Sequence, residues 1–305
     1  MGMSVVVGAG PIGDGVARQL LAHGEQVVVV TRSGRGPEGA QRQALDVARA
    51  EALVPVCEGA DAIYNCANPP YERWVQEWPP MAASMLAAAE ASGAVLVTAS
   101  NLYGYGPVPS GRMAEDLPLA ATGKKGRVRA QMWQEARAAH EAGRVRAVEV
   151  RGSDYVGPGA TSHLERVLPT VLQGGKARVV GDPDAPHSWT YTEDMAAALV
   201  AVATAPEAWG RPWHAPVAAT KSQREALTDL ARAAGLDSAD VAALPGWQLR
   251  AAGWFSPMVK ELQETLYQFD APFVCDDSAI RRELGLRPTS WGEVVRTSVA
   301  AAQVA

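Results

Sequence analysis

The chain has 305 residues, of which 48% are hydrophobic and 20% are charged, and this composition is typical of a folded globular protein. A net charge of -5 and the lack of a dense basic run argue against binding to nucleic acid or to a membrane surface. The three cysteines, Cys57, Cys66 and Cys275, fit neither a disulfide framework nor a zinc site, and no apolar run is long enough to cross a bilayer. Because the N-terminus also lacks a basic targeting pattern, we expect a cytoplasmic protein with free thiols.

Short apolar runs alternate with helical patterns over the first two-thirds of the chain. Ser4–Val7 and Val27–Val30 consist of small or β-branched residues and are predicted to be buried strands. Between them, Ile12, Val16 and Leu20 recur every four residues on one face of a predicted helix. Later strands are expected at Ala62–Asn65, Ala94–Thr98 and Val145–Val150, and helices at Pro79–Ser92 and Lys125–Glu141. This order predicts an α/β fold with a doubly wound parallel sheet of the Rossmann type.

The turn between the first strand and the first helix has the pattern G-x-G-x-x-G. Gly8 permits the tight turn, Gly10 lets backbone approach a pyrophosphate, and Gly13 lets helix and strand pack closely. Pro11 and Ile12 begin the helix, whose N-terminus offers free N–H groups and a positive dipole to phosphates. Strand, loop and helix occur in the required order, so we predict a dinucleotide site rather than a simple connecting turn.

The residues after the second strand bear on the choice of dinucleotide. An NAD site usually has Asp or Glu there, to bind the ribose 2′-hydroxyl, but this chain has Thr31, Arg32 and Ser33. An arginine flanked by hydroxyls suits a 2′-phosphate, so the expected cofactor is NADP(H). The alternative is that Arg32 is an exposed loop charge.

Five further segments carry a resemblance to a known family. They are Asp46–Val47, Asn65–Ala67, the Tyr-Gly-ending run Val97–Gly104, Arg151–Gly159 with its Gly-Pro-Gly turn, and Thr190–Ala196. Together they resemble the extended or atypical branch of the short-chain dehydrogenase/reductase superfamily, which is NAD(P)-dependent epimerase/dehydratase-like. By this resemblance, the cofactor residues beyond the glycine loop are Asp46, Val47, Cys66, Ala67, Asn68, Thr98, Ala99 and Arg129.

The catalytic residues implied by that resemblance are missing. The branch has Ser or Thr where this chain has Ala99, and its Tyr-x-x-x-Lys motif is replaced by Lys125 and Arg129. Arg129 can hold ribose hydroxyls but stays charged and gives up no proton. Lys125, Ser100 and Tyr103 are therefore candidate proton donors, and a substrate with a phenol beside its ketone is a further source. The alternative is that these side chains are solvated charges or packing residues.

Glycines and prolines interrupt the chain repeatedly after Arg151. With the late sheet segment that the resemblance implies, this predicts a dinucleotide-binding lobe of residues 1–150 plus about 189–215. A smaller, mostly C-terminal substrate lobe is expected over about 151–188 and 216–305.

Our main functional hypothesis is an NADPH-dependent ketoreductase acting on a small or polycyclic, aromatic polyketide-like carbonyl compound. It rests on a resemblance to angucyclinone-type ketoreductases of antibiotic biosynthesis that lack the usual tyrosine. Two alternatives stay open: a non-catalytic NADP(H)-binding redox sensor, and a sugar-nucleotide epimerase/dehydratase-like enzyme. The expected partner is the small-molecule carbonyl substrate alone, without nucleic acid or membrane, and the oligomeric state is left open.

The five histidines are scattered and show no metal-binding spacing, so no metal is expected. His187 lies where the extended branch places substrate-facing polar residues, but we expect it at the surface.

Overall fold

A computed structural model describes residues 2–255 and 261–304. Its main sheet has seven parallel strands in the order β11-β7-β5-β4-β1-β2-β3. The strands are β1 Met3–Val7, β2 Gln26–Thr31, β3 Gln41–Ala44, β4 Ala62–Asn65, β5 Val95–Asn101, β7 Arg146–Gly152 and β11 Pro212–His214. The strand order reverses between β1 and β4, which is where open parallel sheets bind ligands. The predicted α/β Rossmann fold is confirmed.

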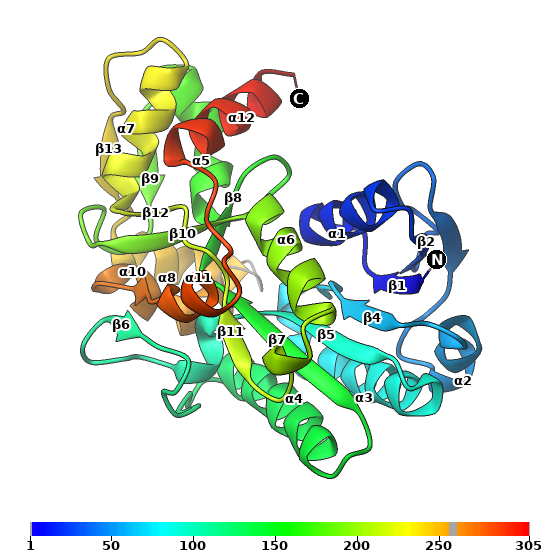
Figure 1. The fold of residues 1–305 in the computed structure, drawn as a ribbon. Coiled ribbons are helices and arrows are strands. Elements are labelled where there is room, and N and C mark those ends of the chain that lie inside the picture. The colour runs from blue at the N-terminus through cyan, green and yellow to red at the C-terminus, as the bar shows by residue number, and fades with distance from the viewer. Residues whose placement is uncertain (1, 256–260, 305) are drawn as a thin grey trace.

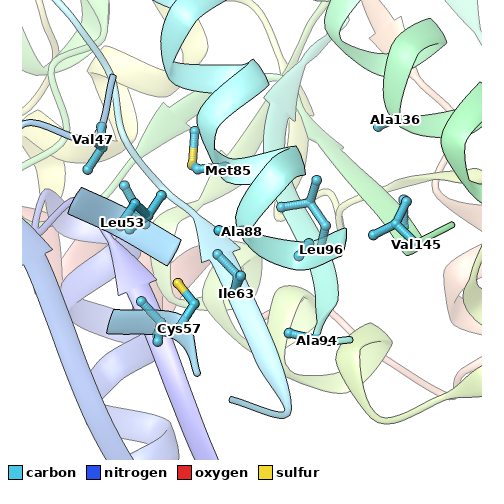
Figure 2. Close-up of a cluster of buried hydrophobic side chains, with 14 of the residues drawn as sticks. Val47, Leu53, Cys57, Ile63, Met85, Ala88, Ala94, Leu96, Ala136 and Val145 are labelled. Carbon is cyan, nitrogen blue, oxygen red and sulfur yellow. The ribbon is translucent and has the colours of Figure 1, made fainter. Parts of the chain in front are cut away.

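Helices cover both faces of this sheet (Figure 1). On one side α1 (Pro11–Ala22) packs against α6 (Thr192–Ala203), and on the other lie α2 (Ala50–Leu53), α3 (Trp74–Ser92) and α4 (Lys124–Glu141). Successive residues of β1 alternate between the two cores: Val6 belongs to the α1 and α6 side, and Val5 to the side of α3 and α4. Figure 2 shows part of this second core, where Ile63 and Leu96 of the sheet meet Met85 of α3.

The structure corrects two expectations about secondary structure. The edge strand β3 is not among the predicted strands, because its sequence Gln-Arg-Gln-Ala is polar and three of its four residues are exposed. Helix α3 starts at Trp74 rather than Pro79, so Pro79 and Pro80 lie inside the helix. Proline has no N–H, so the carbonyl groups of Val75 and Gln76 lack their usual helix donors. Both residues are exposed, so water can donate to these carbonyl groups.

A second group of elements lies outside the main sheet. In the described residues it holds three small sheets, ordered β12-β10-β8, β13-β9 and β14-β6. Their strands are β6 Arg112–Met113, β8 Asp154–Val156, β9 Ala177–Val179, β10 His187–Tyr191, β12 Ala219–Lys221, β13 Val241–Ala243 and β14 Val274–Cys275. The remaining α-helices are α5 His163–Leu172, α7 Gln223–Ala233, α8 Gly246–Phe255, α10 Tyr267–Asp270, α11 Ser278–Glu283 and α12 Trp291–Val304. Short 3-10 helices are η1 Val54–Cys57, η2 Tyr71–Arg73, η3 Leu102–Tyr105, η4 Pro206–Ala208 and η5 Gln263–Thr265.

Helices α5, α7 and α12 share one core around Trp189, and they lie together beside the main sheet (Figure 1). Helix α11 instead contributes Ala279 and Ile280 to the main-sheet core. The predicted lobe ranges 1–150 and 216–305 also include Met1, 256–260 and Ala305, which lie outside the described residues. No helix within the described ranges has both the length and the apolar character that a bilayer span requires.

Candidate functional site

The glycine loop follows β1 and opens α1, and each glycine has a distinct reason to be there. Gly8 has φ +98°, and a Cβ added to it would lie 2.7 Å from the carbonyl oxygen of Cys66. A Cβ on Gly13 would collide with the carbonyl oxygen of Gly8. A Cβ on Gly10 would meet nothing within 4 Å, so this part of the loop is open to an approaching group. The first turn of α1 presents its free N–H groups here, as an anion site requires.

Two cavities meet at this loop. One of about 450 Å³ lies over the ends of β1 and β2, and one of about 310 Å³ extends toward β5 and β8. We call them the outer and the inner cavity. Both are lined by Gly10, Cys66, Ala67 and Asn68, so they adjoin at the glycine loop, and we refer to the two together as the channel. Cavities on both sides of this loop suit a dinucleotide whose pyrophosphate lies at the loop.

Most of the predicted cofactor residues line this channel. The outer cavity contains Gly8, Gly10, Thr31, Arg32, Asp46, Val47, Cys66, Ala67 and Asn68. The inner cavity contains Gly10, Pro11, Ile12, Cys66, Ala67, Asn68, Ala99 and Arg129. Three predicted residues are not in its walls: Gly13 packs against Gly8, Ser33 is exposed, and Thr98 is buried in β5 beside a separate cavity of about 20 Å³.

Arg32 forms part of the wall of the outer cavity but remains largely in solvent. Its side chain is 68% exposed, and Nη1 lies 3.9 Å from a carboxylate oxygen of Glu77. Glu77 also pairs with Arg73 at 3.3 Å, so Arg32 has only a long, shared ion pair. Thr31 donates its hydroxyl to the carbonyl of Arg35 at 3.1 Å. The end of β2 therefore presents an accessible cation rather than a carboxylate.

Arg129 is the most unusual side chain of the inner cavity. It is 7% exposed, and its guanidinium carbon lies 4.6 Å and 4.3 Å from the ring centroids of Trp74 and Trp78. Its Nε and Nη1 are buried without a hydrogen-bond partner. Burial lowers the pKa of Arg129 to about 10, so the group is still charged at neutral pH. Unpartnered charged donors in a cavity wall are costly unless a ligand supplies acceptors, and ribose hydroxyls are acceptors of this kind.

Lys125 lies one turn earlier on α4 but does not line either cavity. Its buried ammonium forms an ion pair with Glu261, and it lies 4.5 Å from the ring centroid of Tyr71. Its backbone N–H donates to Glu264 at 2.7 Å. The side chain predicted as a proton donor therefore connects α4 to the C-terminal part of the chain.

Ser100 and Tyr103, the other predicted donors, do line the inner cavity. Tyr71 and Tyr155 lie in the same wall, and the Tyr155 hydroxyl donates to the carbonyl of Ser100 at 2.9 Å. Burial is the main cause that raises the pKa of Tyr71, Tyr103 and Tyr155, so these phenols stay protonated at neutral pH and ionise with difficulty.

Asp154 is a wall residue that the sequence reasoning missed, and it contacts His187. His187 Nε2 lies 2.8 Å from Asp154 Oδ2, and Nδ1 lies 3.2 Å from the carbonyl oxygen of Gln268. The expectation of a surface histidine is wrong, because β10 places the imidazole inside, where it is 2% exposed and stacks on Phe269 and Phe273. One signal could have found Asp154: it follows a predicted buried strand, and parallel sheets bind ligands at those strand ends.

Within the described residues, no group of three or more His, Cys, Asp or Glu side chains is arranged to hold a metal ion.

The fold is similar to that of several solved structures. The dTDP-glucose 4,6-dehydratase of Bacillus anthracis str. Ames, solved with NAD, has a TM-score of 0.82 at 16% identity, over 100% of this chain and 97% of that one. The UDP-glucose 4-epimerase of Bifidobacterium longum, solved with NAD+ and UDP, has a TM-score of 0.80 at 17% identity, over 99% and 98% of the two chains. The UDP-glucose 4-epimerase of Thermus thermophilus, solved with NAD, has a TM-score of 0.77 at 20% identity, over 99% of both chains.

A search of the curated proteins found no match. A family model described as "NAD dependent epimerase/dehydratase family" matches residues 4–215. This match agrees with the resemblance to the extended short-chain dehydrogenase/reductase branch. The description of the family also names a nicotinamide dinucleotide as its cofactor. Because the match spans more than half of the 305 residues, the chain belongs to the NAD dependent epimerase/dehydratase family.

Proposed function

We propose that the protein is an oxidoreductase that transfers a hydride between a nicotinamide dinucleotide and an alcohol or carbonyl carbon of a sugar-nucleotide or similarly hydroxylated substrate. The observation that carries this proposal is Arg129, a residue of the inner cavity wall whose buried Nε and Nη1 have no hydrogen-bond partner. This arginine occupies the position of the lysine that holds the ribose in the resemblance described above. A bound nicotinamide supplies or accepts the hydride.

The chain's own residues have separate tasks in this scheme. The glycine loop and the N-terminus of α1 bind the pyrophosphate, and Arg129 holds the ribose beside the inner cavity. The substrate hydroxyl or carbonyl lies against the wall formed by Ser100, Tyr103 and Asp154. Tyr71 and Trp74 contribute aromatic surface to the same wall.

The size and polarity of the inner cavity favour a compact, hydroxylated reacting group. Its volume is about 310 Å³, near the lower end of ligand pockets, and a nicotinamide riboside would share that space. Several polar side chains line it: Asn101, Asp154, Ser162, His163 and Arg166. A sugar offers a hydroxyl on nearly every carbon to these donors and acceptors, whereas a fused aromatic polyketide presents mainly flat ring surface. The sugar-nucleotide alternative therefore fits better than the ketoreductase hypothesis, in line with the family.

We further propose that the cofactor is NADP(H). The accessible guanidinium of Arg32 in the outer cavity supports this choice, since it suits a 2′-phosphate and no carboxylate follows β2 directly.

One experiment tests the function. NAD+ and NADP+ are each incubated with UDP-glucose, dTDP-glucose and UDP-N-acetylglucosamine, and products are followed by NMR and by reduced-nicotinamide absorbance. Aromatic ketones with and without an adjacent phenol form the second arm, with NADPH as the reductant. Oxidation, epimerisation or dehydration in the first arm supports the proposal. Turnover confined to phenol-bearing ketones would contradict the proposed function and would support the ketoreductase hypothesis instead.

A second candidate function is cofactor binding without catalysis. It is favoured by Ala99 at the family's Ser/Thr position and by the ion pair that keeps Lys125 out of the cavity. Tight NADPH binding with no turnover in either arm, and partner binding that differs between NADP+ and NADPH, would support it.

A further inference from the structure

Asp154 and His187 form a hydrogen-bonded pair behind the wall of the inner cavity. Asp154 lies in that wall with its side chain 18% exposed, whereas His187 is 2% exposed behind it. The pairing of β8 with β10 brings the two together across 33 positions of the chain. The carboxyl group is therefore the route by which a proton on this pair reaches the cavity.

The hydrogen-bond partners of His187 determine how many protons the pair holds. A backbone carbonyl can only accept a hydrogen bond, so Nδ1, at 3.2 Å from the Gln268 oxygen, carries a hydrogen. An ionised carboxylate also only accepts, so the 2.8 Å contact with Asp154 needs a second hydrogen, on Nε2 or on Oδ2. The pair thus holds one proton more than a neutral imidazole beside an ionised carboxylate.

His214 provides a contrast within the same molecule. Its Nδ1 likewise faces a backbone carbonyl, that of Asp276, at 2.8 Å. Its Nε2 faces the Tyr105 hydroxyl at 2.8 Å, and a hydroxyl can donate. His214 is therefore satisfied as a neutral imidazole, whereas His187 is not.

The titratable side chains around Asp154 are mostly uncharged. Asp154 is near four phenols and one histidine that are neutral at neutral pH: Tyr71, Tyr103, Tyr155, Tyr267 and His163. Lys221, on the neighbouring strand, pairs with Asp229 at 3.0 Å. Arg129 and Arg166 line the inner cavity together with Asp154, but neither forms an ion pair with it. Among the described residues, His187 is the only ion-pair partner of Asp154.

We propose that the Asp154–His187 pair is the acid–base group of the inner cavity, with Asp154 the catalytic residue that exchanges a proton with the substrate oxygen and His187 its positioning residue. The inference rests on the proposed function. It assigns to these two side chains the task that the missing tyrosine leaves open.

The step balances in both directions. In reduction, the substrate carbonyl carbon gains a hydride from the reduced nicotinamide, and its oxygen gains the proton from Asp154. The C=O π bond becomes a C–H and an O–H bond, the nicotinamide is oxidised, and the pair is left as an aspartate and a neutral imidazole. In oxidation, the alcohol proton returns to the pair while the hydride leaves the carbon. Solvent restores the proton through Asp154, the more exposed partner.

The first test counts protons in the free protein and needs no substrate. Imidazole nitrogens are read by long-range ¹H–¹⁵N NMR and the Asp154 carboxyl by ¹³C NMR at pH 7.5, with assignments from His187→Gln, His214→Gln and Asp154→Asn. We expect two protonated nitrogens at His187, or one together with a protonated Asp154, and a single protonated nitrogen at His214. An unprotonated Nε2 at His187 beside an ionised Asp154 would overturn the proposal.

The second test uses turnover of the best substrate of the panel above. Asp154→Asn keeps the shape but holds no transferable proton, so kcat is expected to fall about 10²- to 10⁴-fold with little change in KM. His187→Gln is expected to move the pH profile of kcat. Asp237→Asn, the same change in an exposed carboxylate outside both cavities, is the control and is expected to keep wild-type turnover.

The outcomes of this test separate the two claims. Wild-type turnover with an equally active Asp154→Asn variant leaves the proposed function standing and overturns the role of the pair. No turnover by the wild-type protein overturns the proposed function and with it the catalytic use of the pair, whatever the proton count shows.

Discussion

The hydroxyl of Tyr105 lies 2.8 Å from Nε2 of His214, within a buried chain of hydrogen bonds at the carboxyl end of the main sheet. Arg151 donates to the same hydroxyl at 2.7 Å and to Glu149 at 2.6 Å. His214 donates in turn to the carbonyl of Asp276. The network is complete only if His214 is neutral, and its burial is the main cause that lowers the His214 pKa to about 4.

Stability is therefore expected to depend on His214 in mildly acidic solution. The folded-state pKa lies below that of the unfolded chain, near 6.5, so the contribution is fully present above pH 6.5 and is lost as the pH falls toward about 4. The loss amounts to ~3 kcal/mol of unfolding free energy. Urea unfolding at pH 7.5, 6, 5 and 4.5 measures it. His214→Gln is expected to flatten this dependence, and the exposed His23→Gln to leave it as in wild type.

Arg129→Met separates cofactor binding from stability. The variant removes charged donors that have no partner in the free protein, so the free protein is expected to be no less stable in thermal unfolding. NADPH binding is expected to weaken by about 10- to 100-fold, because hydrogen bonds to a charged group contribute ~1.5–3 kcal/mol. Calorimetric titration measures the affinity. Arg127→Met, an exposed arginine two residues earlier, is the control, and equal losses in both variants would contradict the role of Arg129.

Arg32→Ala tests the choice of dinucleotide. Its guanidinium is exposed and contributes only to the 2′-phosphate in our proposal, so NADPH is expected to bind about tenfold more weakly while NADH affinity is unchanged. Arg35→Ala, also outside the protein core but not in the cavity wall, is expected to alter neither affinity. If Arg32→Ala leaves the NADPH-to-NADH ratio as in wild type, the preference for NADP(H) has another source.

Two alanine substitutions in the glycine loop are expected to differ in their effect on stability. Gly10 has φ -77° and open space around it, so Gly10→Ala is expected to fold with wild-type stability but to lose most of its NADPH affinity. Gly13→Ala forces a methyl group against the Gly8 carbonyl, so both thermal stability and affinity are expected to fall. A Gly10→Ala protein that binds NADPH as tightly as wild type would show that the channel is not the dinucleotide site.

The parts of the fold that are predictable depend on short stretches of sequence. The run from Ser4 to Gly13 contains a strand, a turn and a helix start, and each is favoured by its own residues. The strand β3 is not predictable because it lies at the exposed edge of the sheet, and its sequence lacks the alternation of apolar and polar residues that indicates a strand. The start of α3 is predicted too late because prolines favour the first turn of a helix, although exposed carbonyls tolerate them in its second turn.

The parts of the site that are not predictable depend on contacts between distant segments. Lys125 is buried against Glu261, 136 positions later in the chain, and the sequence around Lys125 gives no indication of that ion pair. His187 is internal because β10 pairs with β8 and turns the imidazole toward Asp154, a consequence of tertiary pairing. The position of Arg129 in the channel wall follows from a local motif. Its two tryptophan neighbours belong to a different helix, α3, and the motif does not predict them.

The contact between α1 and α6 has a consequence for the order in which the protein folds during synthesis. Helix α1 leaves the ribosome within the first 22 residues, but α6, which packs against it over one face of the sheet, begins only at Thr192. The edge strand β11 follows still later, at Pro212. Until then, Val6, Val29 and Tyr64 belong to a half-covered apolar face on the nascent chain. The N-terminal 150 residues are thus poorly suited to fold as an independent unit before α6 and β11 have been added to the chain.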